Sequence, residues 1–96
     1  MNETPTYRID GAAFSDLDGF FDEVGEQLLA GEPWGCSLEA FEDILRGDVA
    51  PLPAQFRIVW EHSGLSHRRL GNTGAGSFTQ LVEMIANHPN VELVLS

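Results

Sequence analysis

Three carboxylates crowd one short stretch of this 96-residue chain. Glu39, Glu42 and Asp43 lie within residues 33–48 at spacings of three and four, which would gather them on one surface of a helix. Like charges at this spacing destabilise a helix by about 0.2–0.5 kcal/mol per pair. Glu39 recovers part of this cost in the first turn, near the positive end of the helix dipole, whereas Asp43 gains nothing there. The stretch therefore predicts either a solvated acidic surface or one kept for a positively charged partner.

The same stretch has the signals of a short amphipathic helix. Ser37 suits the N-cap, since its hydroxyl can accept a hydrogen bond from the first turn, and Gly47 suits the end. Its apolar positions share one face: Leu38, Phe41, Ile44 and Leu45. Before it runs a loop, residues 31–36, in which Trp34 is either a core residue or a partly exposed interface anchor.

Little else in the sequence could carry chemistry. Cys36 is the single cysteine, so no disulfide can form within the chain, and no His or Asn is placed near it in the sequence to activate it. The three histidines lack zinc-ligand spacing, and three aspartates between residues 16 and 22 match only a fragment of a calcium loop. A hydrolase built on the acidic helix would need a concave pocket, whereas this face is expected to be convex. We therefore expect no enzyme, no metal and no cofactor.

The net charge of −10 is confined to the first half of the chain. Residues 1–48 contain 12 Asp and Glu against two Arg, whereas residues 49–96 contain three Glu and three Arg. This asymmetry argues against nucleic acid and anionic membranes as partners and favours a basic protein; the alternative is a surface that only promotes solubility. No apolar run approaches the ~20 residues that span a bilayer, and the N-terminus lacks a signal peptide, so we expect a cytoplasmic protein.

The remaining elements that would position the acidic helix alternate between strands and helices. Strands are expected at 6–10, 55–61 and 91–95, the second covered on both faces and the third in the interior of the sheet. One helix is expected to open at Ser15 and end at Gly31, and another to open at Ser77. We expect a turn-rich connection at 47–53, and at most one turn of helix within 62–76. This order predicts an α/β fold, a three-stranded parallel sheet flanked by three main helices.

The joint order and spacing of these elements resemble the barstar family, the intracellular inhibitors of secreted microbial ribonucleases. The resemblance runs from Tyr7 to Ser96. It rests on IDG before the first helix, on the block LLAGEPWGCSLEAFEDIL, and on the terminal VLS after an amphipathic helix. It implies a single barstar-like domain over residues 1–96, in a bacterial, cytoplasmic protein that is not an enzyme.

The resemblance also implies how the protein acts. The acidic helix and the loop before it would lie across the active site of a basic, guanyl-type microbial ribonuclease in a 1:1 complex. By position, Asp43 matches the central acidic anchor of the family and Glu39 a second acidic contact. On the last helix, Met84 occupies a position that is acidic in the reference, with Glu83 beside it as a substitute. The partner-binding residues implied are Trp34, Gly35, Glu39, Glu42, Asp43 and Glu83.

Three positions depart from the family pattern. Pro33 replaces the first of two tandem tyrosines, Glu42 replaces an aromatic residue, and Met84 replaces an acidic one. These departures leave open an alternative in which the fold is kept but binds a different basic protein or a toxin nuclease.

Overall fold

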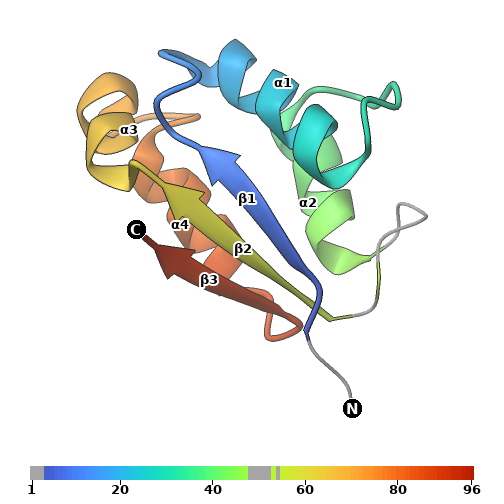
Figure 1. The fold of residues 1–96 in the computed structure, drawn as a ribbon. Coiled ribbons are helices and arrows are strands. Elements are labelled where there is room, and N and C mark those ends of the chain that lie inside the picture. The colour runs from blue at the N-terminus through green and yellow to red at the C-terminus, as the bar shows by residue number, and fades with distance from the viewer. Residues whose placement is uncertain (1–3, 48–52, 54) are drawn as a thin grey trace.

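The computed structural model describes residues 4–47, 53 and 55–96 (Figure 1). The predicted turn-rich connection at 47–53 lies almost wholly outside these residues. The described residues form seven elements: β1 Thr6–Asp10, α1 Leu17–Leu28, α2 Leu38–Arg46, β2 Phe56–Glu61, α3 Ser63–Leu70, α4 Phe78–Ala86 and β3 Val91–Leu95. None of the described helices is long and apolar enough to cross a membrane.

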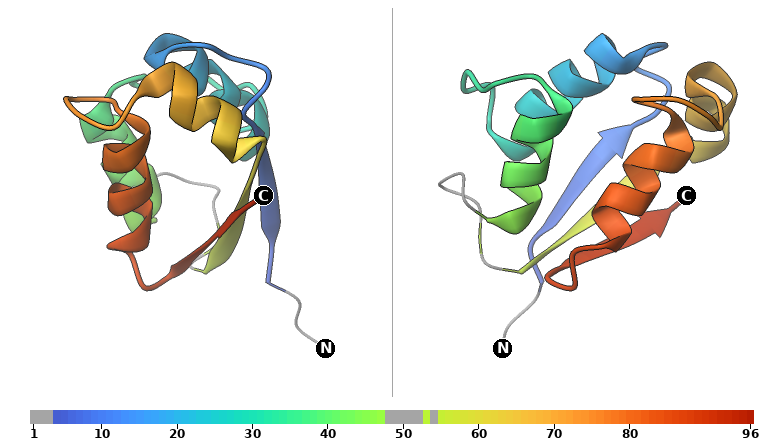
Figure 2. Two further views of the ribbon diagram at one scale, coloured as in Figure 1. Left: turned by 90° about the vertical axis from the view of Figure 1, so that its left-hand side faces the viewer. Right: turned by 180° about the vertical axis from the view of Figure 1, so that it is seen from behind.

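The three strands form one parallel sheet in the order β1-β2-β3. The prediction of a parallel α/β sheet is therefore confirmed, but β3 is an edge strand rather than an interior one, and its Val94 and Leu95 are 37% and 48% exposed. The helices lie on one face of the sheet and leave the other face open (Figure 2). The expectation that β2 is covered on both faces was wrong, because its alternate residues Arg57, Val59 and Glu61 stay partly exposed.

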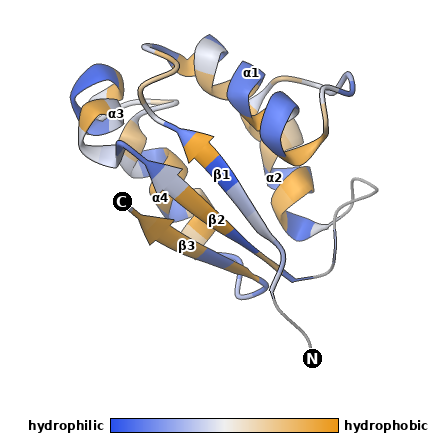
Figure 3. Cartoon of the chain, viewed as in Figure 1, coloured by the Kyte–Doolittle hydropathy of each residue, from blue (hydrophilic) through white to orange (hydrophobic). Residues whose placement is uncertain are grey.

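The core lies between the sheet and the helices. Trp60 at its centre is fully buried, with its ring 5.1 Å from that of Phe20 and 5.0 Å from that of Phe78. The helices α1, α2 and α4 each contribute one apolar stripe and keep their charged residues outside, as the mixed colouring of the helices indicates (Figure 3), whereas the buried residue of α3 is Ser66. Phe41, Ile44 and Leu45 are the buried residues through which α2 joins this core.

The start of α1 differs from the prediction. Asp16, rather than Ser15, is the N-cap, and its carboxylate accepts a hydrogen bond of 2.9 Å from the Gly19 backbone N–H. Aspartate satisfies a free N–H as well as serine does and adds a favourable charge at the positive end of the helix dipole. At the other end, α1 stops at Leu28 with Leu29 as the C-cap, so the first left-handed residue is Ala30, with φ of 53°, and the predicted Gly31, with φ of 82°, comes one residue later.

Residues 63–70 form a full helix, α3, where at most one turn was expected, so four helices accompany the sheet. Tertiary hydrogen bonds explain the difference. The Ser66 hydroxyl is buried, accepts a bond of 3.0 Å from the Trp60 indole N–H and donates one of 3.3 Å to the Gly11 carbonyl. The Ser63 backbone N–H donates to the Ser96 carbonyl at 3.0 Å. Gly11 and Ser96 are distant in sequence, and Trp60 belongs to the preceding strand, so the local pattern of a Gly- and Ser-rich segment does not predict these bonds.

The backbone also makes a close approach at Gly11, just after β1. A Cβ atom there would lie 2.3 Å from the Ser66 Oγ and 2.6 Å from the carbonyl oxygens of Glu61 and His62. Nearby, the Ala12 backbone N–H and the His62 ring hold the pKa of the Asp10 carboxyl below its ordinary value. The ends of β1 and β2 are therefore tightly joined where α3 begins.

We expect Gly11→Ala to lower the free energy of unfolding by about 1–3 kcal/mol, because two of the three crowded neighbours are backbone atoms that cannot move aside. Urea unfolding followed by circular dichroism measures the change. Gly64→Ala is the matched control: it lies within α3, nothing stands within 4 Å of its added methyl group, and it should stabilise the protein by about 0.5–1 kcal/mol. Equal stability of the two variants would contradict the proposed close approach.

Candidate protein-binding site

The helix α2 carries the acidic surface, and both of its ends are capped as the sequence predicts. The Ser37 hydroxyl accepts a hydrogen bond of 3.1 Å from the Ala40 backbone N–H. Gly47, with φ of 83°, ends the helix, and its N–H donates to the Ile44 carbonyl at 3.0 Å. Because the apolar stripe of α2 is buried against the core, the carboxylates lie on the part of the helix surface that remains outside it.

The three carboxylates of α2 have different surroundings. Glu39 is exposed and makes no hydrogen bond or ion pair with any residue that the structure describes. Asp43, one turn later on the same side of the helix, is half-exposed and pairs with the Arg46 guanidinium. Glu42 lies at the flank, and its carboxylate is 2.9 Å from the Nε2 atom of His88. Only Glu39 and Asp43 therefore share the outward face.

The ion pair with Arg46 compensates the negative charge of Asp43, which the helix dipole does not stabilise. Asp43 gains nothing from the helix dipole, but a guanidinium three residues later offsets its repulsion with Glu39. Both side chains are about half exposed, so the pair contributes at most about 1 kcal/mol to stability. A pair this weak leaves the Asp43 carboxylate available to a stronger cationic partner.

The loop before α2 packs against α1. Trp34 is half-buried: its ring meets the ring of Phe21 edge-on at 5.5 Å, and its indole edge lies against Gly25. Trp34 therefore fits both predicted roles in part: it packs on the core, and part of its side chain stays exposed to a partner. Gly35 is exposed, and a Cβ atom there would lie 2.7 Å from the Cβ atom of Ala40. The loop therefore runs close along the first turn of α2, which requires a residue without a side chain.

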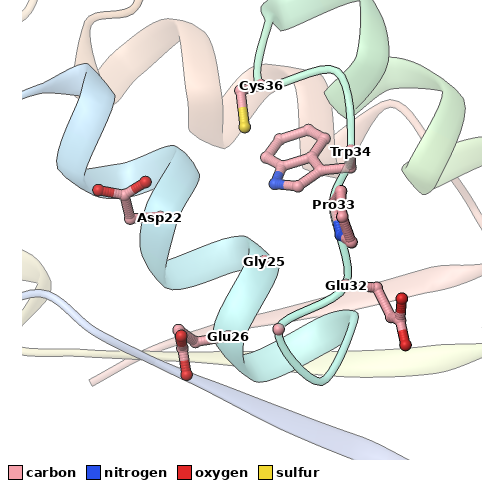
Figure 4. Close-up of a pocket in the computed structure, with 8 residues that line it drawn as sticks. Asp22, Gly25, Glu26, Glu32, Pro33, Trp34 and Cys36 are labelled. Carbon is pink, nitrogen blue, oxygen red and sulfur yellow. The ribbon is translucent and has the colours of Figure 1, made fainter.

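A hollow of about 520 Å³ lies between this loop and α1, beside the contacts of Trp34 (Figure 4). Carboxylates stand on both of its sides, from Asp22 and Glu26 on α1 and from Glu32 on the loop, with the Trp34 indole between them (Figure 4). The Cys36 side chain also lines it. No local pattern in the sequence predicts this hollow, because its two walls are brought together only by the fold. It extends the acidic surface from α2 towards α1.

The last implied residue, Glu83, lies on α4 rather than on α2. Glu83 is exposed, whereas its neighbour Met84 packs against the core. The end of α4 adjoins α2, since His88 contacts Glu42 and the Asn90 side-chain N–H donates to the Leu45 carbonyl at 3.0 Å. His88 and Asn90 were missed by the sequence reasoning, because neither has a local signal that predicts a contact with α2. Among the residues that the structure describes, no group of three or more His, Cys, Asp or Glu side chains could hold a metal ion.

Fold and site together define a small α/β protein in which a parallel three-stranded sheet supports an exposed acidic helix. A family model described as Barstar (barnase inhibitor) matches residues 4–93. The chain therefore belongs to the barstar family, whose members are inhibitors of barnase-type ribonucleases rather than enzymes. No curated protein matches the sequence.

Proposed function

We propose that this protein is a stoichiometric inhibitor of a secreted, basic, guanyl-type ribonuclease, acting in the cytoplasm of a bacterial cell that produces the enzyme. It forms a 1:1 complex without turnover, and α2 with the loop before it covers the active site. The observation that carries the proposal is the outward face of α2: Glu39 is exposed and unpaired among the described residues, and Asp43 is held only by a weak ion pair. Membership of the barstar family supports the same mode.

The chemistry of a ribonuclease site explains why carboxylates can block it. Such a site gathers cationic side chains that bind RNA phosphates, and charge-assisted hydrogen bonds make those side chains bind carboxylates as well. A carboxylate on a rigid helix can occupy a phosphate position without offering a bond to cleave. The net charge of −10 adds long-range attraction to a basic enzyme, which speeds encounter and orients the partners. The proposed interface comprises Trp34, Gly35, Glu39, Asp43 and Glu83, with Glu42 at its flank.

A second candidate keeps the fold and changes the partner to another basic protein or a toxin nuclease. Two observations favour it: the loop carries Pro33 where the family reference has a tyrosine, and Glu42 is turned towards His88. Both alter the surface at which a partner would be selected. Capture of partners from the producing cell on immobilised protein, followed by their identification, separates the two candidates.

Isothermal titration calorimetry against barnase and a panel of other basic microbial ribonucleases tests the proposed function. We expect saturable binding with one site per molecule and loss of RNA cleavage at equimolar inhibitor. Binding to none of the panel, together with capture of a basic protein that is not a ribonuclease, would favour the second candidate.

Replacing Glu39 by Gln should slow association with the ribonuclease more than it speeds dissociation. The variant removes an exposed charge that steers encounter, and the expected loss is about 1.5- to 5-fold in the association rate, in line with ~0.2–1 kcal/mol for an exposed charge pair. Stopped-flow association at several salt concentrations measures it. The rate should depend less steeply on salt than that of the unmodified protein.

Glu92→Gln removes the same charge from the open face of the sheet, where Glu92 pairs with Arg57. This control should change the association rate less than Glu39→Gln does. Equal slowing by both variants would mean that only net charge matters and that α2 is not the face that meets the enzyme.

A further inference from the structure

The turn that follows α4 supplies two polar contacts between α2 and a distant part of the described chain. His88 places its Nε2 atom 2.9 Å from the Glu42 carboxylate, and the Asn90 side-chain N–H donates to the Leu45 carbonyl at 3.0 Å. The buried apolar stripe of α2 also joins the helix to the core. Apolar packing is non-directional, so it limits the rotation of a two-and-a-half-turn helix less strictly than a directed hydrogen bond does.

The turn itself is firmly held. The His88 backbone N–H donates to the Ile85 carbonyl at 3.1 Å, and the Val91 N–H donates to the His88 carbonyl at 3.0 Å. The Phe56 N–H, at the start of the central strand β2, donates to the Asn90 carbonyl at 3.1 Å. The turn is thus tied to α4, to β3 and to the centre of the sheet, which makes it a fixed point for α2.

The position of Glu42 on α2 suits a contact with the fold better than a contact with a partner. Glu42 is four residues after Leu38 and three before Leu45, so it lies beside the packed stripe. Glu39 and Asp43 are four residues apart on the outward side. The Glu42 side chain is 37% exposed and that of His88 only 12%, so the pair lies partly under the surface and is less screened by solvent than the pair of Asp43 with Arg46.

We propose that Glu42 and His88 form a positioning pair that fixes the orientation of α2, so that Glu39 and Asp43 face the ribonuclease. This rests on the proposed function and removes Glu42 from the residues that contact the partner. The pair acts through the hydrogen bond from the His88 ring to the Glu42 carboxylate. The charge of Glu42 is therefore less important for binding than its ability to accept that bond.

Amide hydrogen exchange of the free protein tests the proposal without any partner. In Glu42→Ala and in His88→Ala, we expect the α2 amides to exchange about five- to tenfold faster, as for the loss of one partly exposed, charge-assisted hydrogen bond. The α1 amides should be unchanged. Glu42→Gln and His88→Gln keep an acceptor and a donor respectively, so both should restore exchange to within about twofold of the unmodified protein.

Affinity for barnase, or for whichever ribonuclease of the panel binds, supplies the second readout. Glu42→Ala, His88→Ala and the double variant should weaken binding to the same extent, because each removes the same bond. Glu42→Gln should bind as the unmodified protein does. Glu39→Gln is the matched control: it should weaken binding while leaving the exchange of α2 unchanged.

Several results would overturn the proposal. A loss of affinity in Glu42→Gln as large as in Glu42→Ala would mean that Glu42 meets the partner through its charge. Faster exchange throughout α1, α2 and α4 would mean that the pair contributes only general stability, and unchanged exchange in His88→Ala would mean that it does not hold α2 at all. If no ribonuclease of the panel binds, the proposed function fails, but the exchange experiment still decides whether the pair positions α2.

Discussion

Asp43→Asn should weaken the complex with the target ribonuclease by about 30- to 4,000-fold, the largest loss expected from any single change on α2. The variant keeps the shape of the side chain and removes its charge. Truncating one partner of a charge pair that becomes buried at an interface costs about 2–5 kcal/mol, a general range for which the barnase–barstar complex of this family is one of the source examples. About 1.4 kcal/mol corresponds to a tenfold change in affinity. Most of the loss should appear as faster dissociation, because the cation in the enzyme is left buried without its partner.

Asp43 is singled out from the other carboxylates by its surroundings. It lies on the outward side of α2, and its ion pair with Arg46 is exposed enough to be exchanged for a partner at little cost. Surface plasmon resonance with immobilised ribonuclease would give both rate constants. Glu92→Gln, with the same change in charge on the open face of the sheet, should alter affinity by less than about threefold. An Asp43→Asn variant that binds as tightly as that control would refute the assigned binding mode.

Trp60→Ala should lower the free energy of unfolding by about 3–5 kcal/mol, the typical cost of removing a buried tryptophan from a core. Trp60 is fully buried, packs against Phe20 and Phe78, and donates its indole N–H to the buried Ser66 hydroxyl. The change opens a cavity in the centre of the core and removes the hydrogen bond that helps to hold α3. For a domain of this size, each kcal/mol lowers the melting temperature by about 4–8 °C, so a fall of about 12–40 °C is expected.

Thermal unfolding followed by circular dichroism measures this change, and Trp60→Phe provides a milder variant if Trp60→Ala does not fold. Trp60→Phe keeps an aromatic ring and removes the indole N–H, so it should cost about 1–2 kcal/mol. Trp34→Ala is the matched control, because Trp34 is only half-buried and should cost less than Trp60→Ala. A larger loss in Trp34→Ala would place the centre of the core at the binding loop instead.

Local patterns were sufficient for most of the secondary structure. The Ser37 cap, the apolar stripe and the terminal Gly47 of α2 are all signals within one short segment, and the structure confirms them. The parallel sheet was also predictable, because helices between strands require crossover connections. The start of α1 moved by one residue because Ser15 and Asp16 are both capable caps, and only the path of the chain decides between them.

Contacts between distant segments account for what the sequence could not predict. The helix α3 has weak local signals. It is held by hydrogen bonds between Ser63 and Ser96 and between Ser66 and Gly11, which are far apart in sequence, and by the bond between Ser66 and the buried Trp60. The edge position of β3 depends on the order of the strands in the sheet, which the local sequence of a five-residue strand does not specify. The hollow beside Trp34 has the same cause, since neither wall forms a hollow alone.

In the acidic helix α2, too, local patterns and contacts between distant segments determined different features. The sequence by itself determined that residues 38–46 form a helix with three carboxylates, because caps and periodicity act over single turns. Only the tertiary structure decided how those carboxylates differ: Glu39 is left in solvent, Asp43 is half-exposed with Arg46, and Glu42 is drawn to His88. Glu42 and His88 are 46 residues apart, and no local rule relates them. The packing of the helices on the sheet brings them together and so distinguishes a carboxylate that positions the helix from those proposed to meet a partner.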